Sequence, residues 1–457
     1  MLLAFIFLLL ISLSSGDIPA DRRIDCAPAR DKTKKHCLSN GCIWDDVEKP
    51  ITVPLCYFPE NTGYIASQSF QSGDKSINLQ KSSQSVQNPF GTDFQNLVFE
   101  WKEIGTGVYV KISPANSQRY RPPVPINDSP SISSNEKLQV KSTNGSIFSF
   151  SVYRTSDNED LFDTSIGGLL FADQYIQLSA FLSTNQIVGF GENVHKTLMH
   201  DLSKYLTWGM FARDFPPDAI TDIPLNYYGV HPFYLALNPT TSKAHGVFIF
   251  NSNAQEVTLG PAPHLTYRTI GGQLELFFFP GPTPEAVIQQ YQQVIGRPYL
   301  PPYWALGFQI CRWGYTGTDD IMAVVNRTRA AGIPQDVQFS DIDYMNRYQD
   351  FTYNKDDPNW SNLPTVIDSL HNDYGMHFTL ILDPGVEADY DSFQRGRDAG
   401  AAFIEWPRRM DLVPQDLETA IPWSKGRKSC WAKSGLLTML PSPTFWTPPM
   451  SPTPGGE

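Results

Sequence analysis

Residues 301–382 constrain the fold most, because apolar segments of strand length alternate there with segments of helical length. We predict strands over 304–311, 337–342 and 378–382, separated by helices over 319–331 and 363–374. Apolar strands that alternate with helices are typical of a parallel sheet buried on both faces. In α/β barrels of this kind, side chains at the C-terminal ends of the strands carry the chemistry. Trp313 and Asp341, near the ends of the first two strands, are therefore candidates for a functional site.

A different sequence pattern precedes this region. Residues 64–280 contain short runs of β-branched and aromatic residues separated by Gly, Asn, Ser and Pro, which predicts a β-sandwich. Within it, the Ser- and Gln-rich stretch 67–87 is expected to be a loose linker or variable loop. Thr283 suits an N-cap and Pro284 a first helical position, so a helix should follow and end before Gly296.

The bulk composition is that of a globular protein. Of 457 residues, 41% are hydrophobic and 18% charged, and the net charge is −12. The length suggests roughly two to four domains. The acidic balance argues against nucleic acid or an anionic membrane as a partner.

The N-terminus indicates export. Residues 1–16 combine an apolar run with small residues before Asp17, as in a secretory signal peptide. The run is short for a membrane span, and an uncleaved anchor is the alternative. Four glycosylation sequons begin at Asn127, Asn144, Asn326 and Asn359. We therefore expect a protein of the secretory pathway, whether secreted, lysosomal or at the cell surface, without a membrane span once the signal is cleaved.

The cysteines are unevenly distributed. Four of the six lie within residues 26–56, which in an exported chain predicts a small disulfide module. A zinc site is the alternative, but the paired short Cys/His spacings that it needs are missing. Cys311 and Cys430 stand alone, and Cys311 is expected to be a buried free thiol because no histidine pairs with it in the local pattern.

Residues 22–60 resemble a P-type trefoil domain. The resemblance rests on Cys26-Ala-Pro, Cys37, Asn-Gly-Cys42-Ile-Trp44 and Pro54-Leu-Cys56-Tyr-Phe-Pro59. Such domains have six cysteines in three bonds, and here both partners of one bond are absent. The resemblance therefore implies disulfides Cys26–Cys42 and Cys37–Cys56.

The longer chain resembles glycoside hydrolase family 31, especially its trefoil-bearing α-glucosidases. The matching segments are Leu169–Tyr175, Gly229–Tyr234, Ala244–Phe248, Pro301–Trp313, Ser340–Met345, Asp350–Thr352 and Leu380–Pro384. The resemblance implies a multidomain fold: a small disulfide trefoil (22–60), an all-β sandwich similar to galactose mutarotase (64–280), and the first three β/α units of an incomplete (β/α)8 barrel (283–410). The proline-rich tail 411–457 does not match.

Members of this family hydrolyse terminal α-linked glucose with retention, through two aspartates. The nucleophile lies in a Trp-Ile-Asp-Met-Asn-Glu motif, and none of the ten tryptophans here begins that motif. The acid/base aspartate lies further downstream in the family. No residue of this chain is therefore assigned a catalytic role, and neither a metal nor an organic cofactor is implied.

The resemblance does imply part of a substrate-binding site. Asp341 matches an aspartate that hydrogen-bonds sugar hydroxyls, and Trp313 an aromatic wall. Ile342 and Ile381 match apolar walls, and Asp214 matches an aspartate on a sandwich loop that reaches the next sugar. Each has a simpler alternative: Asp341 could cap the following loop, Asp214 could be a solvated carboxylate, and the three apolar residues could belong to the core.

Three functional readings follow. The favoured one is a family member related to enzymes that release glucose from maltose-type oligosaccharides, with an α-glucoside oligosaccharide as its substrate or ligand. The alternatives are a non-catalytic carbohydrate-binding protein and a truncated product, since three β/α units cannot close an eight-stranded barrel. The oligomeric state is not predicted.

Overall fold

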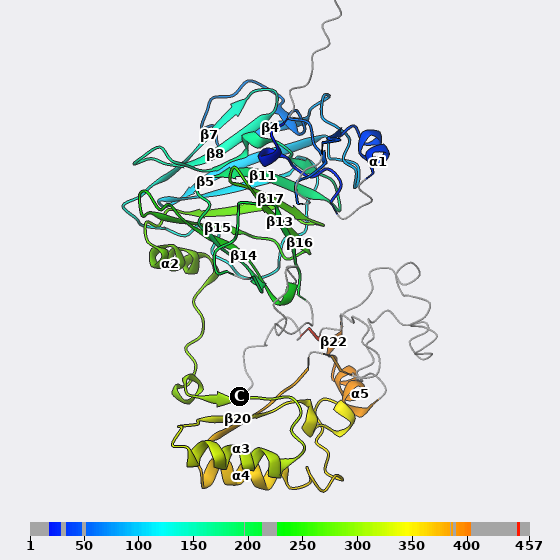
Figure 1. The fold of residues 1–457 in the computed structure, drawn as a ribbon, viewed down its shortest axis with the longest axis vertical. Helices are drawn as coiled ribbons and strands as arrows, with labels where there is room; N and C mark the ends of the chain where they lie inside the picture. The colour runs from blue at the N-terminus through cyan, green and yellow to red at the C-terminus, as the bar shows by residue number, and fades with distance from the viewer. Residues whose placement is uncertain are drawn as a thin grey trace, which may run out of the picture. The chain divides into compact units, whose positions relative to one another are not determined.

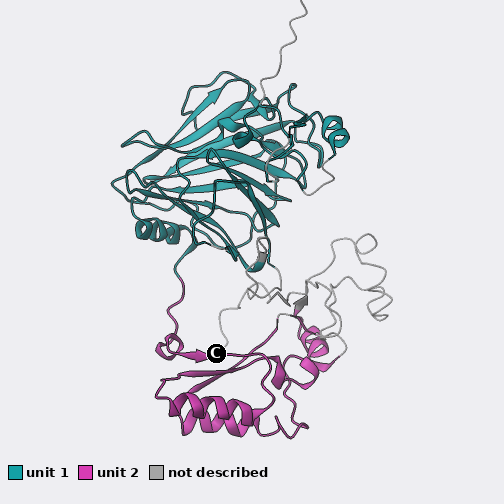
Figure 2. Cartoon of the chain, viewed as in Figure 1, with its two compact units in different colours: residues 1–297 teal, residues 298–457 magenta. Residues whose placement is uncertain are grey.

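The structure is a computed structural model that describes residues 18–28, 33–47, 52–195, 197–212, 226–383, 385–386, 390–403 and 446–447. The chain divides after Arg297 into two compact units (Figure 2), and each unit is described by itself. The expected signal peptide, Asp214, Cys430 and nearly all of the expected tail lie outside the described residues.

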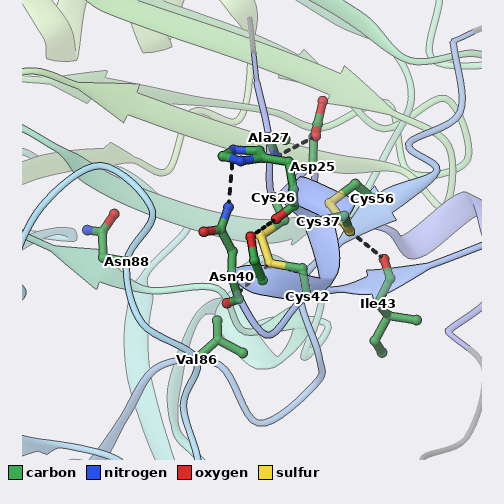
Figure 3. The surroundings of a disulfide bond; sticks show 12 residues. Asp25, Cys26, Ala27, Cys37, Asn40, Cys42, Ile43, Cys56, Val86 and Asn88 are labelled. Carbon is green, nitrogen blue, oxygen red and sulfur yellow. Dashed lines mark hydrogen bonds between the residues drawn. A yellow bond between two sulfur atoms is a disulfide. The ribbon is translucent and has the colours of Figure 1, made fainter. Parts of the chain in front are cut away.

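Unit 1 begins with a small module that contains two disulfides. Its elements are η1 (Ala20–Arg22), α1 (Lys34–Ser39), β1 (Ile43–Trp44) and β2 (Cys56–Tyr57). Cys26 is bonded to Cys42 and Cys37 to Cys56, the pairs that the resemblance implied (Figure 3). Three of these sulfur atoms lie within 4.8 Å of one another, but the disulfides use the thiolates that a zinc ion would need.

The disulfide module packs directly on the sheets that follow it. Its cysteines share an apolar cluster with Leu170 and Tyr175. Arg23, only 2% exposed, pairs with Asp45 at 2.7 Å. The backbone N–H of Arg23 donates to the Tyr205 hydroxyl at 2.8 Å. Buried polar and apolar contacts therefore join the module to the rest of unit 1.

Two sheets, built from antiparallel pairs, form most of unit 1 (Figure 1). The first has the order β13 (Leu206–Met210), β16 (Gln255–Gly260), β17 (His264–Thr269), β11 (Ile176–Leu182), β9 (Asp160–Asp163), β8 (Phe148–Arg154) and β7 (Leu138–Asn144), with β10 (Leu170–Phe171) paired to β11. The second has the order β12 (Ile187–Asn193), β14 (Asn226–Leu237), β15 (Ala244–Ile249), β18 (Leu274–Phe279), β6 (Gly107–Pro114), β5 (Asn96–Ile104), β4 (Ser76–Lys81) and β3 (Tyr64–Ala66). The short η2 (Thr164–Ile166) follows β9.

Both sheets contribute to one hydrophobic core. Phe99 and Val110 of the second sheet and Val152 and Tyr267 of the first belong to the same buried cluster. In β5 the buried residues alternate with more exposed ones, as expected for a strand with one face on the core. The short apolar segments separated by turn residues were thus correctly predicted to form a β-rich region.

One expectation within unit 1 is wrong. The stretch 67–87, expected to be a loose linker, contains strand β4, which pairs with β3 and β5. Ile77 and Leu79 are 4% and 1% exposed and point into the core. Their period-two spacing outweighs the Ser/Gln-rich composition around them, because tertiary burial decides strand formation.

Helix α2 (Pro284–Ile295) closes unit 1 as predicted. The Thr283 side chain accepts a hydrogen bond from the Ala286 N–H, and Pro284 occupies the first helical turn. Gly296 ends the helix with φ of 88°, a backbone conformation that favours glycine.

Unit 2 contains a three-stranded parallel sheet in the order β19 (Gln309–Ile310), β20 (Val337–Ser340) and β21 (His377–Leu380). Its helices are α3 (Thr318–Ala330), α4 (Leu363–Asn372) and α5 (Asp391–Asp398), with short η3 (Tyr303–Leu306), η4 (Ile342–Tyr344) and η5 (Asn346–Tyr348). A separate pair is formed by β22 (Ala402–Phe403) and β23 (Trp446–Thr447). Figure 1 shows α3 and α4 on one side of the parallel sheet, where Val325, Leu370 and Met376 form a buried cluster.

Two details of unit 2 correct the sequence-based expectation. The first expected strand, 304–311, is mostly replaced by η3, and the Gly307 N–H donates to the Trp304 carbonyl at 3.1 Å. Burial on both faces holds for β20 but not for β19 or β21, whose residues are mostly half-exposed or exposed. The physical reason is that each of these two strands has a neighbour on one side only within the described residues.

Within the described ranges, no helix combines the length and apolar character needed to cross a membrane.

Because the disulfide module shares its core with the sheets, its bonds should stabilise unit 1. Replacing Cys37 and Cys56 together by serine is expected to lower the free energy of unfolding by about 3 kcal/mol. The reason is that the bond, which joins cysteines with a sequence separation of 19, restricts the unfolded chain. Thermal unfolding with and without reductant measures this. The matched control is Cys311→Ser, because Cys311 is a free, exposed thiol. Equal melting temperatures for the two variants would contradict the prediction.

Candidate functional site

The candidate site lies where the parallel strands of unit 2 end. Strands β19 and β20 pair through Ile310 and Gln338, and β20 and β21 pair through Ser340 and Leu380. Because parallel strands end at one edge of a sheet, the segments after them must emerge side by side. These segments begin at Cys311, Asp341 and Ile381, and they contain most of the predicted binding residues.

Asp341 is the half-buried residue that directly follows β20. Its Oδ1 accepts a hydrogen bond from the Ile342 N–H at 2.7 Å and so caps η4. The simpler alternative for Asp341, a loop cap, is therefore present. Capping occupies one of roughly four acceptor positions that a carboxylate offers, so it does not prevent a further role in binding.

Cys311 is exposed, so the expectation of a buried thiol is wrong. The residue lies just beyond the two-residue strand β19 rather than inside a longer strand. Although the residue is exposed, neighbouring protein atoms remove part of the water around its sulfur, which raises the pKa of the Cys311 thiol, and the Asp341 carboxylate raises it further. Cys311 follows Ile310, which pairs with Gln338 of β20, so the ends of β19 and β20 lie close to each other.

The three predicted apolar residues differ in their surroundings. Trp313 is 61% exposed, so its side chain is not part of the core. Ile342 and Ile381 are half-buried and pack against the apolar cluster around Tyr344 and Met345. The core alternative thus applies in part to the two isoleucines but not to the tryptophan.

Polar contacts that the sequence did not reveal join the three segments. The Gly314 N–H donates to Asp343 Oδ2 at 2.8 Å, which links the segment after β19 to the one after β20. The Tyr344 hydroxyl donates to the Ile381 carbonyl at 2.9 Å, which links the latter to the segment after β21. Only the position of Asp343 and Tyr344 after an apolar strand could have drawn attention to them.

A buried carboxyl group contacts the last of these segments. Asp350 is 3% exposed, and its Oδ1 accepts a hydrogen bond from the Asp383 N–H at 3.0 Å. Burial raises the pKa of Asp350 to about 6, and the negative charge of Asp383 acts in the same direction. The Asp383 N–H opposes the shift because it stabilises the charged form.

The remaining predicted residues are distributed over both units. Asp214 lies outside the described residues, so its relation to the site is not defined. The four sequon asparagines, Asn127, Asn144, Asn326 and Asn359, are all exposed.

Comparison with known proteins gives this architecture a context. Residues 16–59 match the Trefoil (P-type) domain, and residues 298–426 match the Glycosyl hydrolases family 31 TIM-barrel domain. The chain is 38% identical over 422 residues to intestinal sucrase-isomaltase of Oryctolagus cuniculus, covering 90% of this chain and 22% of that protein. It is 35% identical over 383 residues to lysosomal alpha-glucosidase of Mus musculus, covering 81% of this chain and 38% of that protein.

A solved structure shares the fold. The glucosidase II alpha subunit in its Glc1Man2-bound form has a TM-score of 0.59 over 75% of this chain and 46% of its own, at 17% identity. These matches define a multidomain protein with a trefoil domain, β-rich sheets and part of a glycosidase barrel. The chain therefore contains a trefoil domain and part of the barrel domain of glycoside hydrolase family 31. It spans less than two fifths of the length of either curated relative described above.

The raised pKa of Asp350 predicts a pH-dependent stability. Its folded pKa of about 6 exceeds the ordinary value of 3.8, so protonation favours the folded state. This contribution is complete below pH 3.8 and is lost as the pH rises through 6. From pH 5 to pH 7, the wild type should lose about 1 kcal/mol of stability relative to Asp350→Asn.

Urea unfolding of both proteins across this pH range, followed by hydrogen exchange of the unit 2 peptides, measures the difference. If the difference in stability between the two proteins does not change with pH, the pKa of Asp350 is not raised in the folded protein.

Proposed function

We propose that unit 2 binds the terminal glucose of α-glucosides at the C-terminal ends of its parallel strands. The observation that carries this proposal is the placement of Asp341 directly after β20, close to the segment that holds the exposed Trp313. This end of the strands is the functional face of α/β barrels.

The chemistry of these residues suits a pyranose. The Asp341 carboxylate can accept two hydroxyl protons, which would orient the sugar ring. The exposed indole of Trp313 offers an aromatic face for the C–H side of the sugar. Ile342 and Ile381, half-buried at the same edge, would limit water around the ring. On the family pattern, Asp214 would contact the next sugar.

We further propose the finer architecture that the family pattern implies. The sheets of unit 1 would form a β-sandwich over residues 64–280, and residues 283–410 would supply three β/α units of a barrel, with the disulfide module at 22–60. One core shared by two sheets supports the first assignment, and the strand order β19-β20-β21 supports the second.

The relatives named above are glycosidases described as intestinal and lysosomal. We propose the same broad setting for this chain: the secretory pathway, with a signal peptide at 1–16. The disulfides and the four exposed sequon asparagines support it, since both features belong to exported proteins. The activity of the family is retaining hydrolysis of terminal α-linked glucose. We propose that this chain binds such a sugar without cleaving it, because no residue matches the nucleophile motif.

Binding can be tested with deoxynojirimycin, an iminosugar that mimics glucose. Calorimetry of the full chain should detect binding, and Asp341→Asn should weaken it roughly tenfold or more, because a charged acceptor is lost. Trp313→Ala should also weaken binding. Asp368→Asn, which changes an exposed carboxylate on α4, is the matched control and should bind as the wild type does. Equal affinities for Asp341→Asn and Asp368→Asn would refute the assignment of Asp341.

Turnover is a separate test. The purified chain should release no glucose from maltose or p-nitrophenyl α-glucoside above the uncatalysed rate, because the motif that holds the nucleophile of the family does not occur in the given sequence. Glucose release that deoxynojirimycin suppresses would show that the chain is an active enzyme. A commercial α-glucosidase under the same conditions controls for the assay.

A further inference from the structure

The loop after η5 directs one buried carboxyl group toward the segment after β21. Asp350 accepts the Asp383 N–H through Oδ1 at 3.0 Å, and its own carbonyl accepts the Tyr390 hydroxyl. Asp350 therefore contacts two separate parts of the chain that follow β21. With 3% of the residue exposed, these contacts are shielded from water.

The backbone around Asp350 is held in an unfavourable conformation. Arg347, Tyr348 and Phe351 have φ of 54°, 58° and 63°, which non-glycine residues rarely adopt. Such positions persist only where the surrounding structure imposes them. Here the Asn346 N–H donates to Thr352 Oγ1 at 3.0 Å across the base of the loop. The sharp turn directs Asp350 inward.

Three hydrogen bonds hold the end of β21 and the residues that follow it. The Ile381 N–H donates to the Ser340 carbonyl at 3.2 Å, and the Ile381 carbonyl accepts the Tyr344 hydroxyl at 2.9 Å. Two residues further on, the Asp383 N–H is held by Asp350. The first bond continues the sheet, whereas the other two come from the loop that begins at Asp341.

We propose that Asp350 is a positioning residue, which fixes the end of β21 and with it Ile381 against the loop that carries Asp341. The inference rests on the proposed function only in so far as Ile381 and Asp341 bind the sugar. Asp350 does not itself reach the ligand in this scheme. It acts through the Asp383 amide.

The charges around Asp350 make this link sensitive to pH. Asp383 brings a second carboxylate, while Tyr344 and Tyr390 face Asp350 from η4 and from the start of α5. Because the folded arrangement favours the protonated carboxyl, ionisation must weaken the arrangement by linkage. A protonated carboxyl still accepts the Asp383 N–H through its carbonyl oxygen. The Asp383 N–H itself favours the charged carboxylate, but burial outweighs it, so an opening of the loop that exposes Asp350 to water should be rarer at pH 5 than at pH 7.

Hydrogen exchange of the full chain, read on peptides that cover residues 377–386, tests the link directly. Asp350→Ala should lower the protection factor of this segment about tenfold, because the N–H loses its acceptor. Asp350→Asn should retain the protection, because its amide oxygen can accept the same bond. In this variant the protection factor should no longer fall between pH 5 and pH 7. Asp368→Asn should match the wild type. Wild-type protection in Asp350→Ala would overturn the proposal.

Two further readouts keep the outcome interpretable. If Asp350→Ala unfolds unit 2, protection is also lost in α4. The decisive comparison is then the protection factor of residues 377–386 against pH in the wild type and in Asp350→Asn, and identical profiles would refute the proposal. Deoxynojirimycin affinity should fall about tenfold in a folded Asp350→Ala and stay unchanged in Asp350→Asn at pH 5. A wild type that binds no iminosugar would refute the proposed function, while the exchange data would still judge the role of Asp350.

Discussion

The hydrogen bonding of β20 to both β19 and β21 determines where every candidate side chain of unit 2 lies. Parallel register brings three otherwise distant segments to one edge of the sheet, where Cys311, Asp341 and Ile381 emerge. Helices α3 and α4 support this register from one side through buried apolar contacts. If β20 shifted by one residue, Asp341 would face the opposite side of the sheet, because side chains alternate along a strand. The candidate binding site is therefore a consequence of strand pairing.

The candidate residues at this edge of the sheet fall into two sets, one that can contact a ligand and one that supports the surrounding segments. Asp341 and Trp313 keep surface exposed and can meet a ligand. The other set consists of Asp343, Tyr344 and Asp350, whose side chains form hydrogen bonds with backbone groups of neighbouring segments. A binding site needs such supporting contacts, since a sugar is recognised by groups held in a fixed geometry. Replacing a supporting residue should thus affect recognition without any lost contact to the sugar.

Sequence patterns predicted β20, β21, the helices α2, α3 and α4, and the β-rich region, because these depend on local periodicity and on capping residues such as Thr283. They failed where burial is decided by distant partners. Strand β4 was hidden by its polar composition. Cys311, expected to be a buried thiol, is exposed and lies just beyond the end of β19. Asp350 could not be identified, because its importance depends on Asp383, which follows a different strand. The binding roles of Asp214, Trp313, Asp341, Ile342 and Ile381 came from resemblance and stay predictions.

The packing of the disulfide module bears on how a sugar would be recognised. A module that served as an independent glycan-binding unit would be expected to present its own surface through a flexible connection. Here its cysteines share a core with Leu170 and Tyr175, and Arg23 is buried between Asp45 and Tyr205. Buried ion pairs of this kind are costly to break, because separation leaves a charge without its partner. The module therefore behaves as a structural part of unit 1, and the strand ends of unit 2 are the better candidate for sugar recognition.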